Sequence, residues 1–370
     1  MRLVTVGTCI LAAGFAASLF TVGLSPAGTE SSVWSGKAAA AYLDGRIEWW
    51  AKWPAAARDH GTFCVSCHTV APYALGRPAL RTVLHENGPS PQEIRVVENA
   101  RTRVRGWNEV EPLYSDEKRG VPKTQESRGT ESILNALILT GYDAPAGRLS
   151  PEARLAFDNM WALQLKSGSA RGAWSWLEFH NSPWEGDSQY YGATLAAIAV
   201  GSTPRAYQSA PEIQDNLKLL RDYLQRERGS QVLINQVMLL WAGTKMPGLL
   251  TTAQQESIVQ DALSRQQADG GFSLSSFVGA WKRHDGTALE TRSDGYATGL
   301  VCFVLQEAGI RREQARLQRG LAWLQLNQEK ADGRWLAYSL NKQQDLNSDA
   351  GRLMSDAATA YAVLALVRAE

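Results

Sequence analysis

Residues 356–367 read DAATAYAVLALV, and residues 294–305 read DGYATGLVCFVL. Both stretches have the length of a helix, carry no polar face and are rich in alanine or glycine. A helix that is apolar all round has to be buried, and small side chains at helical spacing let neighbouring backbones approach closely. These two stretches therefore predict inner helices of an all-α protein.

Segments of a second kind alternate with the buried ones. Residues 211–228 (PEIQDNLKLLRDYLQRER) and 311–328 (RREQARLQRGLAWLQLNQ) place apolar side chains at helical spacing and charged ones between them. This pattern predicts outer helices with one face on the core and the other in solvent.

The buried kind of segment recurs along the chain. It occurs six times, at residues 67–84, 130–141, 187–200, 230–242, 294–305 and 356–367. The starts lie roughly 45 to 65 residues apart and an amphipathic segment precedes each, which is typical of a helical-hairpin repeat. Six hairpins with shielded inner helices close into a double-layered ring that leaves no apolar end exposed. We therefore predict an (α/α)6 toroid, as one domain over residues 28–370.

Three loops share a motif of glutamine, glycine and an aromatic residue. The copies are residues 319–335 (RGLAWLQLNQEKADGRW), residues 263–272 with Gln266, Gly271 and Phe272, and residues 161–174 with Gln164, Gly172 and Trp174. They resemble the QW repeat of the squalene-hopene cyclase and protein prenyltransferase superfamily. The resemblance covers the chain from about residue 150 to its end and implies an α/α toroid with a central cavity. We expect a structural role, in which glycine makes a tight turn, tryptophan caps a helix and glutamine binds backbone groups.

Residues 60–68 read HGTFCVSCH and contain Cys64, Cys67 and His68 in the order C-x-x-C-H. This is the attachment pattern of c-type haem, in which two thiols add to the porphyrin vinyl groups and the imidazole binds iron. We expect segment 60–70 to attach haem c at the start of the first inner helix, with His68 as the proximal ligand. The match to c-type cytochromes is confined to the motif itself.

Other interpretations of C-x-x-C-H are a disulfide, a redox dithiol or half of a zinc site. A zinc site needs further cysteines or histidines at suitable spacing, and the sequence has no second C-x-x-C. A redox dithiol usually follows a strand in a βαβ context, which this sequence lacks. Haem attachment is therefore the favoured interpretation.

All connections from an outer to an inner helix lie on one rim of the predicted ring. His60, His180 and His284 occur in such connections and share this rim with His68. Each is a candidate distal iron ligand, and we rank His284 and His180 above His60, whose tether to His68 is short. The alternative for each is a surface loop histidine. An iron with no distal protein ligand would favour small-ligand or peroxide chemistry over electron transfer.

The loops of residues 173–187 and 273–294 gather aromatic and charged side chains at the same rim. Among these are Trp174, Trp176, Trp184, Trp281, Arg283 and Glu290. They suit either a partly apolar ligand at the toroid mouth or a packed lid.

Charged residues elsewhere have simpler interpretations. We expect Asp187, Asp294 and Asp356 to be helix N-caps, with pKa values lowered by the helix N-terminus. Residues 91–116 carry Arg101, Arg103 and Arg105 on a polar face, which we expect to be solvated or to dock a redox partner. The D-x-D-D acid of terpene cyclases is absent, so cyclisation by protonation is not expected. Cys302 lies in an inner helix without a zinc-ligand set around it.

The composition and the N-terminus indicate an exported protein. With 38 Lys+Arg against 37 Asp+Glu the net charge is +1, without the basic excess of a nucleic-acid binder. Arg2 precedes an apolar run at residues 3–24 and a small-residue site at 25–27, which predicts a signal peptide over residues 1–27, or else a membrane anchor. We expect a periplasmic or otherwise extracytoplasmic location, where haem c attachment occurs.

The sequence thus predicts an exported c-type haem protein on a squalene-cyclase-like toroid. It would transfer electrons to a redox partner protein or oxidise a partly apolar small molecule at the toroid mouth. One alternative is an isoprenoid- or lipid-handling enzyme or carrier in which C-x-x-C-H is structural. A third is a scaffold that binds partner proteins through its long loops.

Overall fold

The computed structural model describes Met1 and residues 34–180, 183–184 and 188–369. In this part the chain is helical, and its only extended pairing is an isolated bridge between Ala57 and Phe63. Residues from Trp34 onward form one compact unit. Apart from Met1, the predicted signal peptide lies outside the described residues. Among the described helices, none has the length and hydropathy needed to cross a bilayer.

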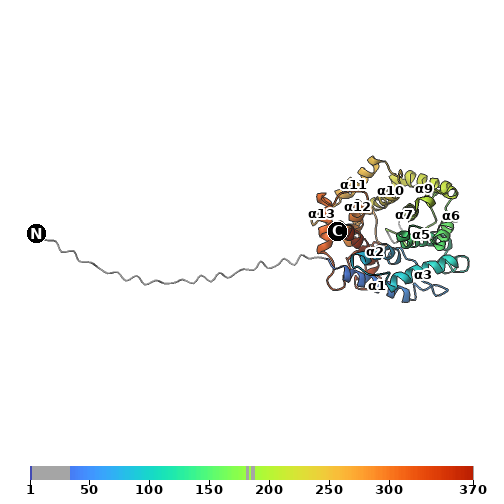
Figure 1. The fold of residues 1–370 in the computed structure, drawn as a ribbon, viewed down its shortest axis with the longest axis horizontal. Coiled ribbons are helices and arrows are strands. Elements are labelled where there is room, and N and C mark those ends of the chain that lie inside the picture. Colours follow the sequence, from blue (N-terminus) through green and yellow to red (C-terminus); the bar gives the residue numbers. More distant parts are fainter. Residues whose placement is uncertain (2–33, 181–182, 185–187, 370) are drawn as a thin grey trace. The chain divides into compact units, whose positions relative to one another are not determined.

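An inner ring of helices forms the centre of this unit (Figure 1). Within the described residues it consists of α2 (Val70–Val83), α5 (Lys123–Asp143), α7 (Ser188–Gly201), α10 (Leu233–Lys245), α12 (Gly295–Glu307) and α14 (Arg352–Ala369). Each inner helix packs against the next one, and α14 packs back against α2, so the ring is closed. All six predicted inner helices are confirmed.

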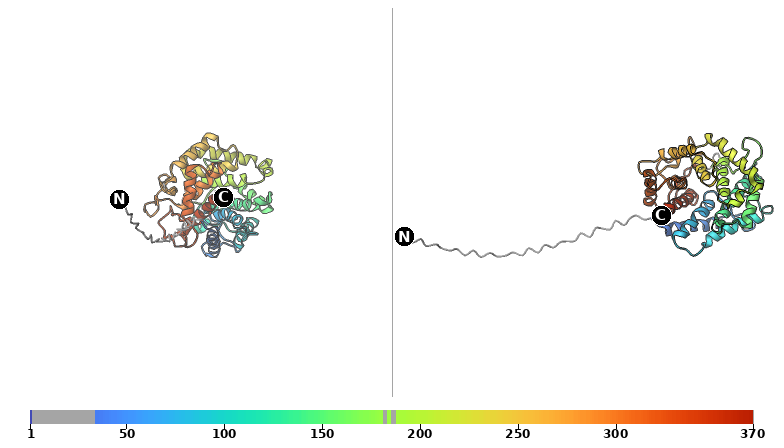
Figure 2. Two further views of the ribbon diagram at one scale, coloured as in Figure 1. Left: turned by 60° about the vertical axis from the view of Figure 1, so that its left-hand side comes forward. Right: turned by 45° about the horizontal axis from the view of Figure 1, so that its top comes forward.

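A second layer surrounds the ring, as the turned views also show (Figure 2). It consists of α1 (Gly36–Lys52), α3 (Pro91–Arg105), α6 (Pro151–Ala162), α9 (Gln214–Glu227), α11 (Thr252–Ser264) and α13 (Ala315–Leu326). Each outer helix packs on the inner helix before it in the ring, and α1 packs on α14. The connections hold α4 (Asp116–Arg119), α8 (Arg205–Gln208) and the single-turn helices η1 (Ala144–Ala146), η2 (Pro211–Ile213), η3 (Arg228–Ser230) and η4 (Leu274–Phe277). The protein is an (α/α)6 toroid.

Glycines allow the inner helices to touch through their backbones. A Cβ on Gly299 of α12 would lie 2.6 Å from the Ala362 nitrogen of α14, and one on Gly76 of α2 would lie 3.0 Å from the Ala360 oxygen. Side chains larger than hydrogen would push these helices apart. The prediction drawn from small residues in the buried segments is confirmed.

The loop that carries the last glutamine motif closes the ring between its ends. The Gln328 amide donates to the carbonyls of Gly333 (2.8 Å) and Ser35 (3.1 Å), and its oxygen accepts the Ser35 N–H (2.6 Å). Trp335 Nε1 donates to the Leu324 carbonyl at the end of α13 (2.8 Å). Because Ser35 caps α1, Gln328 joins the sixth hairpin to the first.

The other two copies repeat this geometry. Gln164 donates to the Gly172 carbonyl and to a carbonyl of α9, each at 3.0 Å. Gln266 donates to the Gly270 carbonyl (2.8 Å) and to a carbonyl of α13 (2.6 Å). The turn glycine of this copy is Gly270, with φ of 94°, and the expectation of Gly271 was wrong by one residue. The structural role predicted for the motif is confirmed.

Candidate functional site

The C-x-x-C-H segment lies directly before α2, at the N-terminal end of the inner ring, and outer helices fix its backbone. Trp50 Nε1 of α1 donates to the Cys64 carbonyl at 2.8 Å. The Asn99 amide of α3 pairs with both backbone groups of Phe63, at 2.8 and 3.0 Å. Both thiols, of Cys64 and Cys67, are buried.

A buried ion pair braces the same segment. Arg103 of α3 is fully buried, bonds both carboxylate oxygens of Glu131 and donates to Thr62 Oγ1 at 2.7 Å. The expectation that Arg103 is solvated was therefore wrong, although the Arg105 side chain is 55% exposed. A helical pattern places Arg103 on the polar face, whereas the acid that buries it comes from α5, far along the sequence.

The His68 ring is oriented by a hydrogen-bond chain. Its Nδ1 lies 2.9 Å from Thr69 Oγ1, which donates to Asp356 Oδ2 at 2.7 Å. Because the Thr69 proton is used toward Asp356, Nδ1 must donate to Thr69, and the lone pair lies on Nε2. Burial, with a smaller effect of the Arg46 charge, lowers the pKa of His68 to about 3, so the imidazole is neutral.

Asp356 is the centre of this network. It also accepts from Arg46 Nε (2.7 Å) and the Tyr42 hydroxyl (2.8 Å) of α1. Its prediction as an N-cap was wrong: α14 begins at Arg352, and Asp356 lies inside the helix with its carboxylate toward α1 and Thr69. Asp356 therefore links α14, α1 and the C-x-x-C-H segment.

Asp294 caps α12 as predicted, but its pKa moves in the other direction. Its carboxylate accepts backbone N–H groups of Ala297 (2.9 Å) and Leu274 (2.6 Å). Burial nevertheless raises the pKa of Asp294 to about 7, and burial also raises the pKa of Asp356. The expected lowering by helix N-termini was wrong because desolvation of a buried carboxylate outweighs it. Asp187 lies outside the described residues.

Aromatic rings fill the ring interior next to His68. Its imidazole meets Trp50 edge-on at 5.0 Å between ring centroids and meets Trp184 at 5.5 Å. The contacts continue inward in the order Trp184, Tyr296, Tyr361 and Trp241, at centroid distances of 5.9, 5.5 and 6.4 Å. The Trp184 and Tyr296 side chains at the start of this series are both buried.

Two of the predicted distal ligands meet each other at the rim. The rings of His180 and His284 are perpendicular, with centroids 3.8 Å apart, and His180 stacks on Trp281 at 4.2 Å. His60 is exposed, with Nε2 3.7 Å from Asp59. Among the described residues, the rings in contact with His68 are those of Trp50 and Trp184, and neither belongs to a candidate distal ligand. Distal ligation by His60, His180 or His284 therefore stays a prediction.

The rim loops form a packed lid. Arg283 is buried, pairs with Glu290 and donates from Nε to the Ser339 carbonyl at 2.9 Å. Trp281 Nε1 donates to the Leu340 carbonyl at 2.8 Å. These contacts join the loop of residues 273–294 to that of the next hairpin, as expected for the lid alternative.

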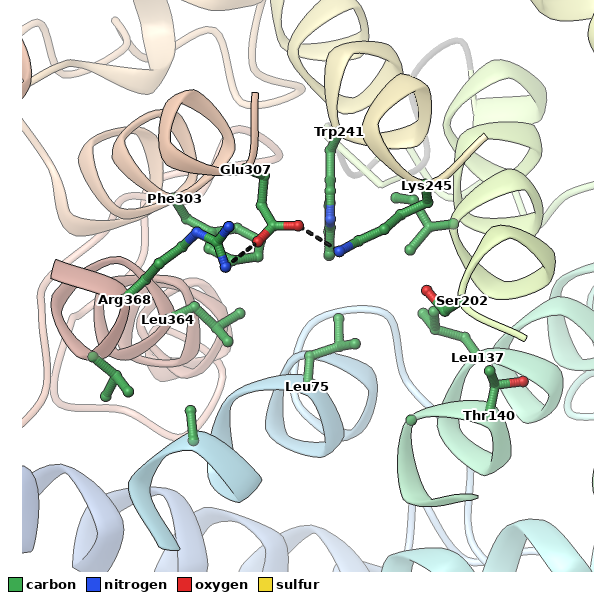
Figure 3. A pocket seen from close by; sticks show the side chains of 14 residues that line it. Leu75, Leu137, Thr140, Ser202, Trp241, Lys245, Phe303, Glu307, Leu364 and Arg368 are labelled. Carbon is green, nitrogen blue, oxygen red and sulfur yellow. Dashed lines mark hydrogen bonds and ion pairs between the residues drawn. The ribbon is translucent and has the colours of Figure 1, made fainter. Parts of the chain in front are cut away.

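A cavity lies at the other end of the ring. It encloses about 380 Å³ between the C-terminal halves of all six inner helices (Figure 3). Glu307 of α12 pairs there with Lys245 of α10 (2.5 Å) and Arg368 of α14 (2.7 Å). These three residues were not predicted from the sequence, although charged side chains at the C-terminal ends of apolar helices were a usable signal.

The donor set at His68 suits a haem iron in its chemistry. The imidazole is neutral, Nδ1–H is held, Nε2 carries the lone pair, and two cysteines precede it at haem-attachment spacing. Across the described residues, no cluster of three or more His, Cys, Asp or Glu side chains is arranged to hold a metal ion.

Comparisons with known proteins identify no family. No protein-family model matches the chain, and no curated protein matches it. Among solved structures, a glycosidase variant in complex with glucose is similar with a TM-score of 0.48 and 13% identity, over 89% of this chain and 97% of that one. The closed ring of helices described above, rather than this likeness, defines the fold.

Proposed function

We propose that this protein is an exported c-type haem protein that transfers electrons, with Cys64 and Cys67 anchoring the porphyrin and His68 binding the iron. The hydrogen-bond chain from His68 through Thr69 to Asp356 carries the proposal. Histidines that bind metals usually donate their second ring N–H to an acceptor, which fixes the ring and raises the basicity of the ligating nitrogen. In this chain Nδ1 has such a partner, and Nε2 is left for iron.

The surroundings of His68 also support haem attachment. Trp50 and Trp184 provide an apolar wall, and a bound haem supplies one-electron chemistry whose potential such burial tunes.

An aromatic cluster at the end of α1 supports electron transfer over oxidation of a ligand. Trp53 is exposed at the surface and stacks on Trp49 at 5.1 Å, and its ring is 5.4 Å from that of Trp50, which contacts His68. A redox partner protein that docks on Trp53 would therefore be close to the proposed haem ligand. The buried Arg46 guanidinium, which is paired with Asp349 and Asp356, packs over the Trp49 ring at 4.1 Å from its centroid and helps to hold this cluster in place.

The experiment is expression with haem-maturation machinery, followed by a pyridine haemochrome spectrum and mass spectrometry of the intact chain. We expect one covalent haem, and its loss in the double variant Cys64→Ser, Cys67→Ser. Cys302→Ser is the matched control, because this buried thiol lies in α12 away from the motif. A colourless chain without added mass overturns the proposal.

Carbon monoxide distinguishes the two haem roles. If His180 or His284 ligates the iron, the reduced wild-type protein resists carbon monoxide and the corresponding alanine variant binds it. Rapid binding by the wild-type protein means an open iron, and contradicts simple electron transfer.

An isoprenoid- or lipid-handling protein is the second candidate. The common geometry of the three glutamine motifs supports the resemblance to the squalene-hopene cyclase and prenyltransferase superfamily. This candidate predicts that Cys64→Ser with Cys67→Ser leaves lipid binding intact.

A further inference from the structure

The cavity at the C-terminal end of the inner ring lies at the end opposite the C-x-x-C-H motif. Its walls are mainly apolar and include Leu75, Leu137, Ile198, Phe303 and Leu364, each from a different inner helix (Figure 3). A volume of about 380 Å³ is within the range of small-molecule sites. The size and walls fit the apolar body of one small ligand.

Two buried polar groups of the lining lack a hydrogen-bond partner in the described part of the chain. Trp241 is 3% exposed and Thr140 is 1% exposed, and neither Trp241 Nε1 nor Thr140 Oγ1 has a hydrogen-bond partner among the described residues. Leaving such a group unpaired costs about 1–3 kcal/mol, so most buried polar groups in proteins are paired. The indole N–H can only donate, and its missing partner is therefore an acceptor.

The edge of the cavity carries excess positive charge. Lys245 and Arg368 both pair with Glu307, so two cations and one carboxylate leave a net charge of +1. The Glu307 side chain is 6% exposed, whereas those of Lys245 and Arg368 are 33% and 48% exposed. Trp241 precedes Lys245 by one turn of α10, and both side chains line the cavity (Figure 3). The free donor and the excess charge therefore favour an anion at the same place.

We propose that this cavity binds an anionic amphiphile. Its apolar body fills the space between the inner helices, and its carboxylate, sulfonate or phosphate accepts the Trp241 N–H and pairs with Lys245 and Arg368. None of the lining residues belongs to the hydrogen-bond network of His68, Thr69 and Asp356, and Trp241 is where the lining meets the aromatic contacts that lead to His68.

Two dyes with one aromatic body test the proposal. Anilinonaphthalene sulfonate is anionic, and phenylnaphthylamine lacks the sulfonate. By fluorescence titration of the purified protein, we expect the anionic dye to bind more tightly. Lys245→Met should weaken the anionic dye about tenfold and leave the neutral dye unchanged, because a charge-assisted contact is lost while Arg368 still pairs with Glu307. Equal affinities for the two dyes overturn the proposed specificity.

A cavity-filling variant tests the location. Gly141 of α5 lines the cavity, and a Cβ there meets no atom within 4 Å, so Gly141→Leu fills the space without a backbone clash. We expect both dyes to be lost with the unfolding midpoint maintained or raised. Gly229→Leu is the matched control, since Gly229 is exposed and equally unobstructed. Ala79→Leu, on α2, fills the cavity from another helix. Retained dye binding in either folded filling variant refutes the cavity as the site.

Discussion

The two ends of the inner ring differ in how the same six helices are completed. At the N-terminal end, aromatic side chains fill the interior, and buried ion pairs of Asp356 and Glu131 hold the C-x-x-C-H segment against outer helices. At the C-terminal end, mainly aliphatic side chains line an open cavity, and the charges of Lys245 and Arg368 reach solvent. We call the N-terminal end of the inner ring the rigid end and its C-terminal end the open end. The difference comes from the side chains that the inner helices direct inward at each level.

The largest expected effect is on the buried network of the rigid end. Asp356→Ala leaves Arg46 buried without its closest carboxylate and should lower the free energy of unfolding by about 3–5 kcal/mol. Glu307→Ala at the open end should cost about 1 kcal/mol or less, because Lys245 and Arg368 are partly hydrated. Urea unfolding measures both, and equal losses would remove the distinction between the ends.

The rigid end should also make stability depend on pH. The pKa of Asp294 is about 7 in the folded protein against an ordinary 3.8, so the unfolded chain releases this proton first as pH rises. The contribution of Asp294 to the free energy of unfolding is fully present below its ordinary pKa of 3.8. It is lost as pH rises from 3.8 to about 7, by up to about 4 kcal/mol. Asparagine is also a good N-cap, so Asp294→Asn should keep the cap and remove most of the change in the free energy of unfolding with pH across this window, as urea unfolding at a series of pH values measures. Asp285→Asn, at an exposed site in the same loop, should leave the slope in this window intact. An unchanged slope in Asp294→Asn contradicts the assignment.

Replacing Thr69 and Thr140 by valine should change the free energy of unfolding in opposite directions. Thr69→Val removes the link between His68 and Asp356 and should cost about 2 kcal/mol, because the acceptor is charged and the ring N–H loses its partner. Thr140→Val removes an unpaired hydroxyl and should raise the free energy of unfolding by about 1 kcal/mol. Thermal or urea unfolding measures both, and a loss in Thr140→Val would mean that the open end is not poised for a ligand.

The smallest expected effects come from two glycines of one helix. Gly129 lies toward the N-terminal end of α5, where a Cβ would be 1.9 Å from the Ser175 carbonyl oxygen, and Gly129→Ala should cost about 1–3 kcal/mol. Gly141→Ala, at the cavity, should stabilise by about 0.5–1 kcal/mol through helix propensity. Comparison of unfolding midpoints tests the pair, and similar values would mean that packing at the two ends is alike.

Several features followed from the sequence because they depend on neighbouring residues. A stretch such as residues 356–367 has no polar face, so burial was its only stable environment. The glutamine motifs were recognisable because the glutamine, the turn glycine and the aromatic residue of each copy lie in one stretch of sequence, although each glutamine also binds a carbonyl group of another hairpin. The cap at Asp294 was predicted, because capping bonds reach only the first turn of the helix.

Other features could not be predicted because their partners are distant along the chain. Arg103 looks solvated until Glu131 of another helix covers it, and Asp356 looks like a cap until α1 supplies Arg46. The direction of the Asp294 pKa shift depends on how completely the surrounding loop excludes water from its carboxylate. The cavity depends on side-chain size at one level of six helices, which no single segment reveals.

The sequence by itself determined the layers of this protein, since hydrophobic periodicity is a local property that any compact chain must satisfy. It also placed two thiols and an imidazole at the entrance to the first inner helix. Only the tertiary structure decided which ring nitrogen of His68 remains available and which end of the ring stays open. Hydrogen-bond partners and packing volume are set by groups that meet only when the ring closes.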